Sequence, residues 1–562
     1  MSDKSTDFLT KLQNANESER DWLIMEMSLQ NLSETLQQAV WAAAIPHWFD
    51  RDFLNAILAN PLKDSDFETL KELSFVEVFP ERGFNVHERS RKLLLDKLWT
   101  TNKARYQRLS KRAAAYCKKQ DQSITAWRVE TLYHGLLANN LNAKENFIIQ
   151  GVDWLNSFQY DKLENLTQIL LGAVNSGFIT GEAAARVAFM QARLDILYSR
   201  YSSAQSFLQQ ALQQKTNEIL TAHCIQYLGD VHYHLSEHEQ ARDCYRRALI
   251  RYQKIKNIRG EEANCIQSLG DVHLSLAEYK QAGNCYQKAL SIYKQFENGR
   301  VGEASCIQGF GDIHKYLAEY EQAQDYYSQA LLIYQQIKSR LGEANCFRCL
   351  GQLQGAQSQT GLAIITLQQA AQIYEQIGVK SGEANCFDDL ATIYQQQKQF
   401  AEALVMENKA IKIFPDEVGF YQNRAFIHTK MDDYEKAEAD IKQAETMGKD
   451  PAYTLLHKAT LALWQQQPTQ AVTLCQQTLA QRPADGNVRA MFALTLLADG
   501  QAPVADKELK EALTTIYQQH DIDSLLDDLD KLARIYGQSP EIEALREQVL
   551  TKEKPLLTQN TT

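Results

Sequence analysis

The sequence has 562 residues and a formal net charge of −11, which excludes a chain-wide affinity for polyanions. No stretch approaches the roughly twenty apolar residues of a membrane span, and the polar start Met-Ser-Asp-Lys-Ser-Thr-Asp lacks the apolar run of a signal peptide. Ten cysteines are present, and most recur periodically, which indicates buried free thiols rather than a disulfide framework. Free thiols suit a reducing compartment, so we expect a cytoplasmic protein.

The N-terminal part of the chain predicts a few short helices. Residues 1–20 are polar and are expected to be flexible, and helices are expected at about 21–44. Further helices are expected after Asp50 and after Asp64 or Ser65, because these side chains can cap a helix N-terminus.

A hairpin pattern follows these helices. Phe75-Val-Glu-Val-Phe79 alternates as a strand does, Pro80-Glu-Arg-Gly83 predicts a turn, and Phe84-Asn-Val-His87 predicts a second strand. Together with Glu-Arg-Ser-Arg91, the segment from Leu70 resembles the winged helix that follows the nucleotide-binding core of STAND-type signalling ATPases, which often continue into repeat arrays. No Gly-x-x-x-x-Gly-Lys-Ser/Thr phosphate loop occurs, so the resemblance does not imply ATP-driven switching. We expect a winged-helix-like module over residues 21–100.

The one basic run lies next to this module, at residues 88–119. It holds eleven Lys and Arg residues against Glu88 and Asp96, a local charge of +9, so the remainder of the chain sums to −20. This asymmetry makes nucleic-acid binding the alternative function. The competing interpretation is a solvated helix face, or a surface that docks on the protein's own acidic part. The candidate nucleic-acid contacts are Arg105, Arg108, Lys111 and Arg112.

Residues 101–182 predict atypical helical hairpins that link this module to a repeat array at 183–517. Within the array, a unit of about forty residues recurs from Thr221 to Pro415. Three repeat-equivalent positions define the period: cysteine at 224, 265, 306, 346 and 386; glycine at 229, 270, 311 and 351, with Ala391 closing the set; and alanine at 248, 289, 330, 370 and 410. A fixed period in this range predicts a solenoid of stacked helix pairs, since one pair cannot bury its apolar face alone.

The residues within one unit identify the kind of repeat. Leu269-Gly270, then Tyr279, Ala282, Tyr286 and Ala289, resemble the tetratricopeptide repeat (TPR), which is usually about 34 residues long. The longer period, with Gly-Glu-Ala at the seams at 302–304, 342–344 and 382–384, resembles the long-repeat variety found in Pins-like scaffolds and bacterial signalling arrays. We therefore expect an all-α TPR superhelical solenoid preceded by the winged-helix-like module.

The ends of the array look less regular. Residues 183–216 look like a degenerate first repeat, and the units after Pro415 shorten, which gives about nine repeats in all. Two amphipathic helices over 518–552 are expected to cap the exposed apolar end of the solenoid, and residues 553–562 are expected to form a disordered tail.

The concave groove is the candidate binding surface, because the first helix of each TPR pair lines it. If this register holds, it is lined by amides, aspartates and one arginine: Asn264, Asn345, Asn385, Gln267, Gln308, Asp230, Asp271, Asp312 and Arg348. Amides can bond a peptide backbone, and three stacked aspartates would favour a basic partner. The competing interpretation is that these residues are repeated copies that bond one helix to the next.

The sequence offers no other chemistry. Cys346 and Cys349 form a Cys-x-x-Cys, but Cys346 belongs to the periodic packing set, and a metal site would need further ligands nearby. No His-Glu-x-x-His, Gly-x-Ser-x-Gly or dinucleotide glycine loop is present. We predict a non-enzymatic scaffold without metal or cofactor that binds a protein or peptide, a basic segment being one option. A scaffold for an enzyme supplied by another chain is a third interpretation.

Overall fold

The computed structural model describes residues 15–256, 258–448, 451–483, 485–515 and 519–559. The segment 1–20, expected to be flexible, lies mostly outside the described residues. The last three residues of the expected tail, 553–562, lie outside them too, while a helix continues as far as Gln559.

The chain divides into two compact units. Unit 1 comprises Met1–Leu197 and Ser202–Cys224, and unit 2 comprises Tyr198–Tyr201 and Ile225–Thr562. The boundary falls within one helix, α12 (Glu218–His234), whose first turns belong to unit 1.

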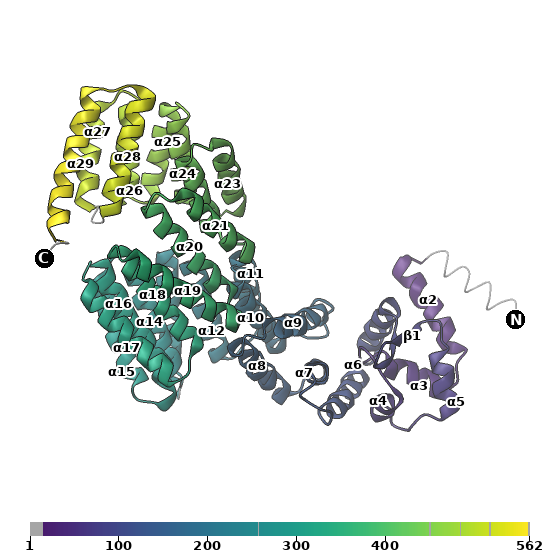
Figure 1. Cartoon of the computed structure of the whole chain (residues 1–562). Helices are drawn as coiled ribbons and strands as arrows, with labels where there is room; N and C mark the ends of the chain where they lie inside the picture. Colours follow the sequence, from purple (N-terminus) through teal and green to yellow (C-terminus); the bar gives the residue numbers. More distant parts are fainter. Residues whose placement is uncertain (1–14, 257, 449–450, 484, 516–518, 560–562) are drawn as a thin grey trace. The chain divides into compact units, whose positions relative to one another are not determined.

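The described part of unit 1, from residue 15 on, is helical apart from one hairpin (Figure 1). Its elements are α2 (Glu17–Gln30), α3 (Glu34–Ala43), α4 (Arg51–Ile57), α5 (Asp64–Lys71), β1 (Val76–Phe79), β2 (Gly83–Val86), α6 (Glu88–Cys117), α7 (Thr125–Leu137), α8 (Leu141–Asn156), α9 (Tyr160–Asn175), α10 (Glu182–Leu197) and nearly all of α11 (Tyr201–Gln213).

The hairpin forms where alternating residues predicted it. β1 and β2 pair antiparallel with Val76 opposite Val86, and Phe84 forms a further bridge to Phe49. Asp50 caps α4 as expected, accepting a hydrogen bond of 2.7 Å from the backbone N–H of Phe53. The expected order of helices and hairpin is therefore present, and the assignment of this segment as a winged helix stays a prediction.

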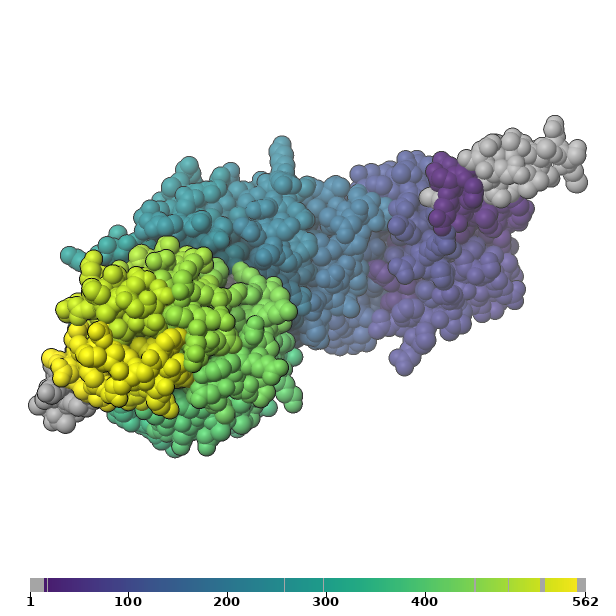
Figure 2. Space-filling model, turned by 90° about the horizontal axis from the view of Figure 1, so that it is seen from above, coloured from purple at the N-terminus to yellow at the C-terminus, as the bar shows by residue number. Residues whose placement is uncertain are grey.

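Unit 2 consists of helix pairs in succession. Its helices after α12 are α13 (His238–Tyr252), α14 (Arg259–Ser275), α15 (Tyr279–Tyr293), α16 (Arg300–Tyr316), α17 (Tyr320–Gln336), α18 (Arg340–Ala356), α19 (Thr360–Ile377), α20 (Lys380–Gln396), α21 (Phe400–Ile413), α22 (Val418–Lys430), α23 (Tyr434–Met447), α24 (Pro451–Trp464), α25 (Pro468–Gln481), α26 (Gly486–Ala498), α27 (Ala502–Thr515), α28 (Gln519–Tyr536) and α29 (Pro540–Gln559), with a 3-10 turn at Glu297–Gly299. The last helices, whose atoms are coloured yellow-green to yellow in Figure 2, share one apolar core with buried residues from Ala459 to Val549.

Small buried residues set the spacing between helices. The periodic alanines on the second helix of each long repeat, from Ala248 to Ala410, are fully buried. The periodic cysteines, from Cys224 to Cys386, are also buried and none forms a disulfide. The sequence-based interpretation of these cysteines as small packing residues is confirmed.

In each of the three long repeats from α12 to α17, a tyrosine ring on the second helix packs directly on a glycine of the first helix. We call this contact the clasp. Tyr286, on α15, is almost fully buried. A Cβ at Gly270, on α14 of the same repeat, would lie 2.7 Å from its ring, and a Cβ at Gly309, on α16 of the next, would lie equally close. Because no side chain larger than hydrogen fits at either position, these glycines set the packing of one helix on the next.

We predict opposite effects for two Gly-to-Ala changes in this repeat. Gly270→Ala should destabilise the array by about 1–3 kcal/mol, because its methyl group overlaps the Tyr286 ring. Gly283→Ala, in the middle of α15, should stabilise by up to about 1 kcal/mol, because its nearest atom lies 3.8 Å away and alanine favours the helix. Urea unfolding followed by circular dichroism measures both. Equal midpoints for the two variants would contradict the clasp.

Candidate functional site

The three predicted aspartates hold the helices of their own repeats together. Tyr245 donates a hydrogen bond to Asp230, Tyr286 to Asp271 and Tyr327 to Asp312, each at 2.7 Å. Each pair joins the first helix of a repeat to the second, fifteen residues further on. The interpretation of the repeated aspartates as bonds between helices thus has a structural basis.

The middle aspartate, Asp271, is buried close to the other two carboxylates, which makes its charged form less favourable. Burial raises the pKa of Asp271 to about 7, with the Asp312 and Asp230 carboxylates adding to the rise and the Tyr286 hydroxyl opposing it. Burial raises the pKa of Asp312 as well. A carboxyl that is half protonated near neutrality contributes less negative field than a formal charge implies.

The predicted amides accept hydrogen bonds from a second set of tyrosines. Tyr293 donates to Asn264 at 2.5 Å, and Tyr374 donates to Asn345 at 2.5 Å. The second-row glutamine Gln267 accepts from Tyr293 as well, at 3.2 Å. Since the hydroxyls take the amide oxygens, the amide nitrogens remain as the donors of this face.

The other predicted groove residues also bond within the array. Gln308 accepts from the Cys346 thiol at 3.9 Å and donates to the Cys349 sulfur at 3.5 Å. Arg348 bonds Asp389 on α20 through its Nε, at 2.5 Å. Asn385 lies half-buried on α20. Eight of the nine predicted residues therefore form bonds within the array, and none of the nine is among the lining residues of the cavities that follow.

The fourth long repeat loses the tyrosine–aspartate bond. Gln352 stands where the earlier repeats have aspartate, and Leu367 stands where they have tyrosine. A different network replaces it: Lys315 donates to Gln352 at 3.2 Å, and Gln352 donates to Asp389 at 2.9 Å. Small residues at Gly355 and Ala356 leave space beside this network.

A cavity of about 380 Å³ opens at this irregularity. It is lined by residues of helices α16 to α20, of the turn between α16 and α17, and of α27 and α28: Lys315, Tyr316, Ala318, Tyr320, Gln352, Gly355, Ala356, Leu367, Asp389, Thr392, Ile393, Gln396, Thr515 and Asp521. The cavity therefore depends on the departure of one repeat from the pattern of its neighbours.

Two further cavities continue along the first helices of the later repeats. One, of about 610 Å³, lies between α28 and the helices α20 and α22. The other, of about 670 Å³, is lined by α20, α22, α24, α26 and α28. Thr392 and Asp521 line all three cavities. The cavities therefore adjoin, and we call them together the channel.

The 670 Å³ cavity mixes amide, aromatic and aliphatic side chains. Asn423 and Asn487 supply amides, whereas Phe426, Tyr453 and Leu494 supply ring and aliphatic surface. A few polar groups set among apolar side chains is the usual composition of a binding pocket.

A neutral histidine faces the same cavity. His457 is half-buried, and its ring centre lies 6.2 Å from that of Phe426. Burial lowers the pKa of His457 to about 4, so at neutral pH its imidazole carries no charge and can both donate and accept hydrogen bonds.

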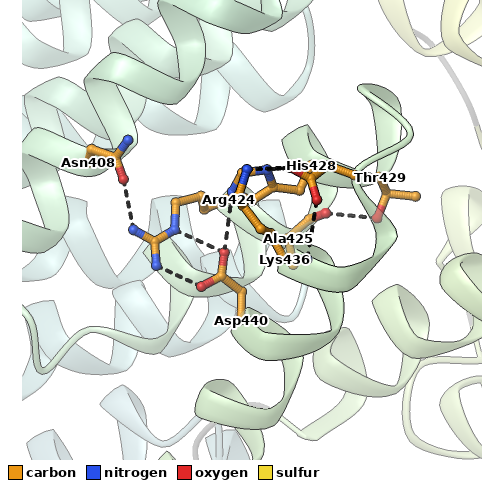
Figure 3. Close-up of polar contacts among 8 residues, drawn as sticks. Asn408, Arg424, Ala425, His428, Thr429, Lys436 and Asp440 are labelled. Atoms are coloured by element: carbon orange, nitrogen blue, oxygen red, sulfur yellow. Dashed lines mark hydrogen bonds and ion pairs between the residues drawn. The ribbon is translucent and has the colours of Figure 1, made fainter.

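An ion pair on the other side of α22 fixes that helix (Figure 3). Arg424 bonds Asp440 of α23 through Nε at 2.9 Å and through Nη2 at 2.6 Å. Its Nη1 donates to Asn408 of α21 at 2.8 Å. The two-point contact orients α22, and with it the channel residues Asn423 and Phe426.

Asn423 has a second support. Its amide nitrogen donates to Asp388 at 2.5 Å. Glu407, fully buried on α21, lies against Asp388; burial raises the pKa of Glu407 well above its ordinary value, and the Asp388 carboxylate adds to the rise. A protonated Glu407 beside Asp388 avoids two adjacent buried charges, and Asp388 is left to hold Asn423.

Helix α28 closes one side of the channel through ion pairs. Lys430 meets Asp528 at 2.6 Å with both side chains largely buried, and Lys398 meets Asp527 at 2.6 Å. Lys531 contacts Asp432, also at 2.6 Å. A helix expected only to cap the array thus contributes lining residues.

The basic run of unit 1 is partly engaged in structure. Arg112, one of the predicted nucleic-acid contacts, donates to the carbonyl oxygen of Ile57 at 3.0 Å. Arg105 is half-buried, and burial lowers its pKa. Arg108 and Lys111 are exposed. The structure therefore separates the four predicted contacts into two engaged or half-buried residues and two on the surface.

Other ligand chemistry finds no support among the described residues. No three His, Cys, Asp or Glu side chains gather there as metal ligands would. Three histidines recur at steps of 41 residues, His232, His273 and His314, and each pairs with a glutamate five residues on, as His232 does with Glu237 at 2.5 Å. None of the helices in the described part of the chain is long and apolar enough to cross a membrane.

Models of the tetratricopeptide repeat match residues 219–295 and 303–376, residues 384–414, and residues 418–447. These matches confirm the predicted tetratricopeptide repeats between residues 219 and 447, and the all-α fold is confirmed with them. The bounds of the array, 183–517, stay a prediction. None of the curated proteins matches the chain.

Solved structures of repeat proteins are similar at low identity. A STAND protein with a tetratricopeptide repeat sensor from Pyrococcus horikoshii is 14% identical over 77% of this chain, with a TM-score of 0.41, and the match spans 65% of that protein. A Rap protein complexed with competence and sporulation factor is 15% identical over 70% of this chain and 99% of its own, at 0.44. Aspartyl phosphate phosphatase F from Bacillus subtilis is 13% identical over 63% and 92%, at 0.39. With every TM-score below 0.5, no function is carried over from these proteins.

The Asp271 contact predicts a pH-dependent stability. Because its folded pKa lies above the unfolded value of about 3.9, the stability that it contributes is complete below about pH 4 and is lost as the pH rises to about 7. Asp271→Asn keeps a hydrogen-bond acceptor for Tyr286 and removes the titrating carboxyl, so it should raise the free energy of unfolding at pH 8. It should also reduce the slope of that free energy against pH by up to about 1.4 kcal/mol per pH unit.

Asp271→Ala is the matched control. It also removes the titration but leaves the Tyr286 hydroxyl without an acceptor, which should cost about 1–3 kcal/mol relative to Asn. Urea midpoints between pH 4 and 8 measure all three proteins. An Asn variant that is no more stable than the Ala variant would show that the hydrogen bond contributes nothing.

Proposed function

Because the chain carries a tetratricopeptide-repeat array, we propose that it is a non-catalytic scaffold that binds a protein partner in the channel. The observation that carries this proposal is the run of three adjoining cavities along the first helices of successive repeats. A surface that extends over several repeats suits a ligand that is itself extended, and solenoids use their concave faces in this way.

The chemistry of the channel favours one kind of segment. The amides of Asn423 and Asn487 can bond a peptide backbone, while Phe426, Leu456 and Met491 offer apolar surface to side chains. The three aspartates that suggested a basic partner already accept hydrogen bonds from tyrosine hydroxyls of their own repeats. We therefore expect an extended peptide segment with bulky apolar side chains rather than a run of lysines and arginines.

Rigid support of the lining residues strengthens the proposal. Arg424 and Asp440 fix α22 from behind, Asp388 holds Asn423, and the Lys430–Asp528 pair holds α28. A pre-formed surface loses little conformational entropy on binding, which raises the affinity that a given set of contacts can give.

The nucleic-acid alternative concerns a different surface, the exposed side of α6 in unit 1. Binding at the two surfaces can be separated by salt, since phosphate contacts weaken steeply with ionic strength and channel contacts do not.

We predict that Thr392→Arg blocks the channel. Thr392 is exposed and lines all three cavities, so an arginine there fills their junction without disturbing a buried contact. Peptides selected from a phage-displayed library on the wild-type chain should lose at least tenfold in affinity for the variant, measured by fluorescence anisotropy. Thr473→Arg, an exposed threonine on the second helix α25, is the matched control and should bind as the wild type does.

A second variant maps the segment more finely. Ala356→Tyr places at the 380 Å³ cavity the residue that the preceding repeat has there, Tyr316. It should weaken those peptides whose apolar side chain enters this cavity. Peptides that bind wild type, Thr392→Arg and Thr473→Arg equally would contradict the channel as the binding surface, as would a selection that enriches no peptide.

A further inference from the structure

Helix α6 is two helical segments joined at a kink. Asn102 has φ −151° and ψ 67°, outside the helical region. Before the kink three of the four cations are engaged, Lys92 being exposed: Arg89 bonds Asp21 at 2.9 Å, Arg91 donates to the carbonyl oxygen of Ile45 at 2.9 Å, and Lys97 lies 4.6 Å from the ring centre of Trp22. The first half of the basic run therefore serves the fold of unit 1.

The second half presents its cations to solvent. Tyr106, Leu109, Ala113 and Cys117 bury one side of the helix. Five exposed basic residues, which we call the α6 basic face, lie along this second half and directly after its end: Lys103, Arg108 and Lys111 on the helix, and Lys118 and Lys119 just beyond Cys117. Among these five, Lys103 lies 4.2 Å from the ring centre of Trp99.

No described carboxylate neutralises the α6 basic face. Within the described residues, Arg108, Lys111, Lys118 and Lys119 form no ion pair, in contrast to Arg89 in the first half of the helix. Asp121, the nearest acidic residue along the chain, instead accepts a hydrogen bond of 2.9 Å from the backbone N–H of Ser123. Uncompensated cations in a row raise the local concentration of anions.

The same face lacks apolar anchors. None of the large hydrophobic residues that are exposed in the described structure lies between 103 and 119. Cores of protein–protein interfaces are rich in aromatic and aliphatic side chains. A surface built from charge alone suits a ligand that is bound through charge alone.

We propose that the α6 basic face binds the phosphate backbone of nucleic acid without reading its sequence. From Lys103 to Cys117, where it ends, the helix rises about 21 Å, a length that holds about six phosphates of one strand. With the remainder of the chain strongly acidic, a polyanion is held at this face and repelled elsewhere. The site lies in unit 1 and is independent of the channel in unit 2.

Fluorescence anisotropy with a labelled 20-base-pair DNA duplex tests the proposal, using the full chain between 50 and 200 mM salt. A variant with Arg108→Gln, Lys111→Gln, Lys118→Gln and Lys119→Gln keeps good helix formers at exposed positions. The matched control carries Lys254→Gln, Lys256→Gln, Lys280→Gln and Lys288→Gln, which remove the same charge from exposed positions of unit 2.

The wild type should bind the duplex with an affinity that falls steeply with salt. Each phosphate that the protein no longer neutralises lowers the slope of log affinity against log salt by about 0.9, so the α6 variant should lose a slope of about 3 to 4 and at least tenfold in affinity. The control should change neither. A single-stranded RNA of equal length, tested in parallel, shows which nucleic acid is held more tightly.

Three results would overturn the proposal. The first is no binding of either nucleic acid by the wild type at 50 mM salt. The second is an equal loss of affinity in the α6 variant and the control, which would mean that only net charge matters. The third is binding to phosphatidylserine-containing vesicles with none to duplex or RNA, which would assign the face to a membrane surface. Circular dichroism confirms that both variants stay folded.

Discussion

The packing of the array depends on tyrosine side chains that connect the two helices of one repeat to each other and to the first helix of the next repeat. In the second long repeat the ring of Tyr286 fills the space left by Gly270 and Gly309, and its hydroxyl bonds Asp271. The contact combines close packing with a satisfied buried polar group, two requirements of a stable interior. Because each repeat touches only its neighbours, local contacts of this kind between adjacent helices stabilise the array.

The channel opens where this clasp is abandoned. The fourth long repeat exchanges tyrosine for Leu367 and aspartate for Gln352, and the fifth has Glu407 and Thr392 at the same positions. The polar groups released there form other contacts, from Lys315 through Gln352 to Asp389 and from Asp388 to Asn423. Regular repeats thus supply stability, while irregular ones supply the surface on which a partner can be recognised.

The period of cysteine, glycine and alanine was enough to predict the fold, because these small residues recur wherever the helices of one repeat pack on those of the next, similar repeat. The groove was harder to predict. Asn264 and Asp271 lie on the first helices as expected, but whether they face a ligand or a neighbouring helix depends on tyrosines 29 and 15 residues later. Pairing those positions across the repeats would have shown that Asp and Tyr are lost together in the fourth copy.

Other features have no local signal at all. Asp521 and Asp528 reach the channel because α28 lies against residues about a hundred positions earlier, such as Lys430. Likewise, Arg112 reads as an exposed cation in the sequence, yet its guanidinium bonds a carbonyl oxygen 55 residues away. Contacts of this kind follow from how the helices stack, and the spacing of residues along the chain does not reveal them.

The most direct measurement of the central claim is site-specific photo-cross-linking in a lysate of the source cells. Benzoylphenylalanine would replace Phe426, which faces the channel, or Ile365, an exposed residue on the second helix α19. The account predicts a discrete protein adduct from position 426 that Thr392→Arg abolishes, and none from position 365. An adduct from position 365 alone, or one from position 426 that persists with Thr392→Arg, would contradict it.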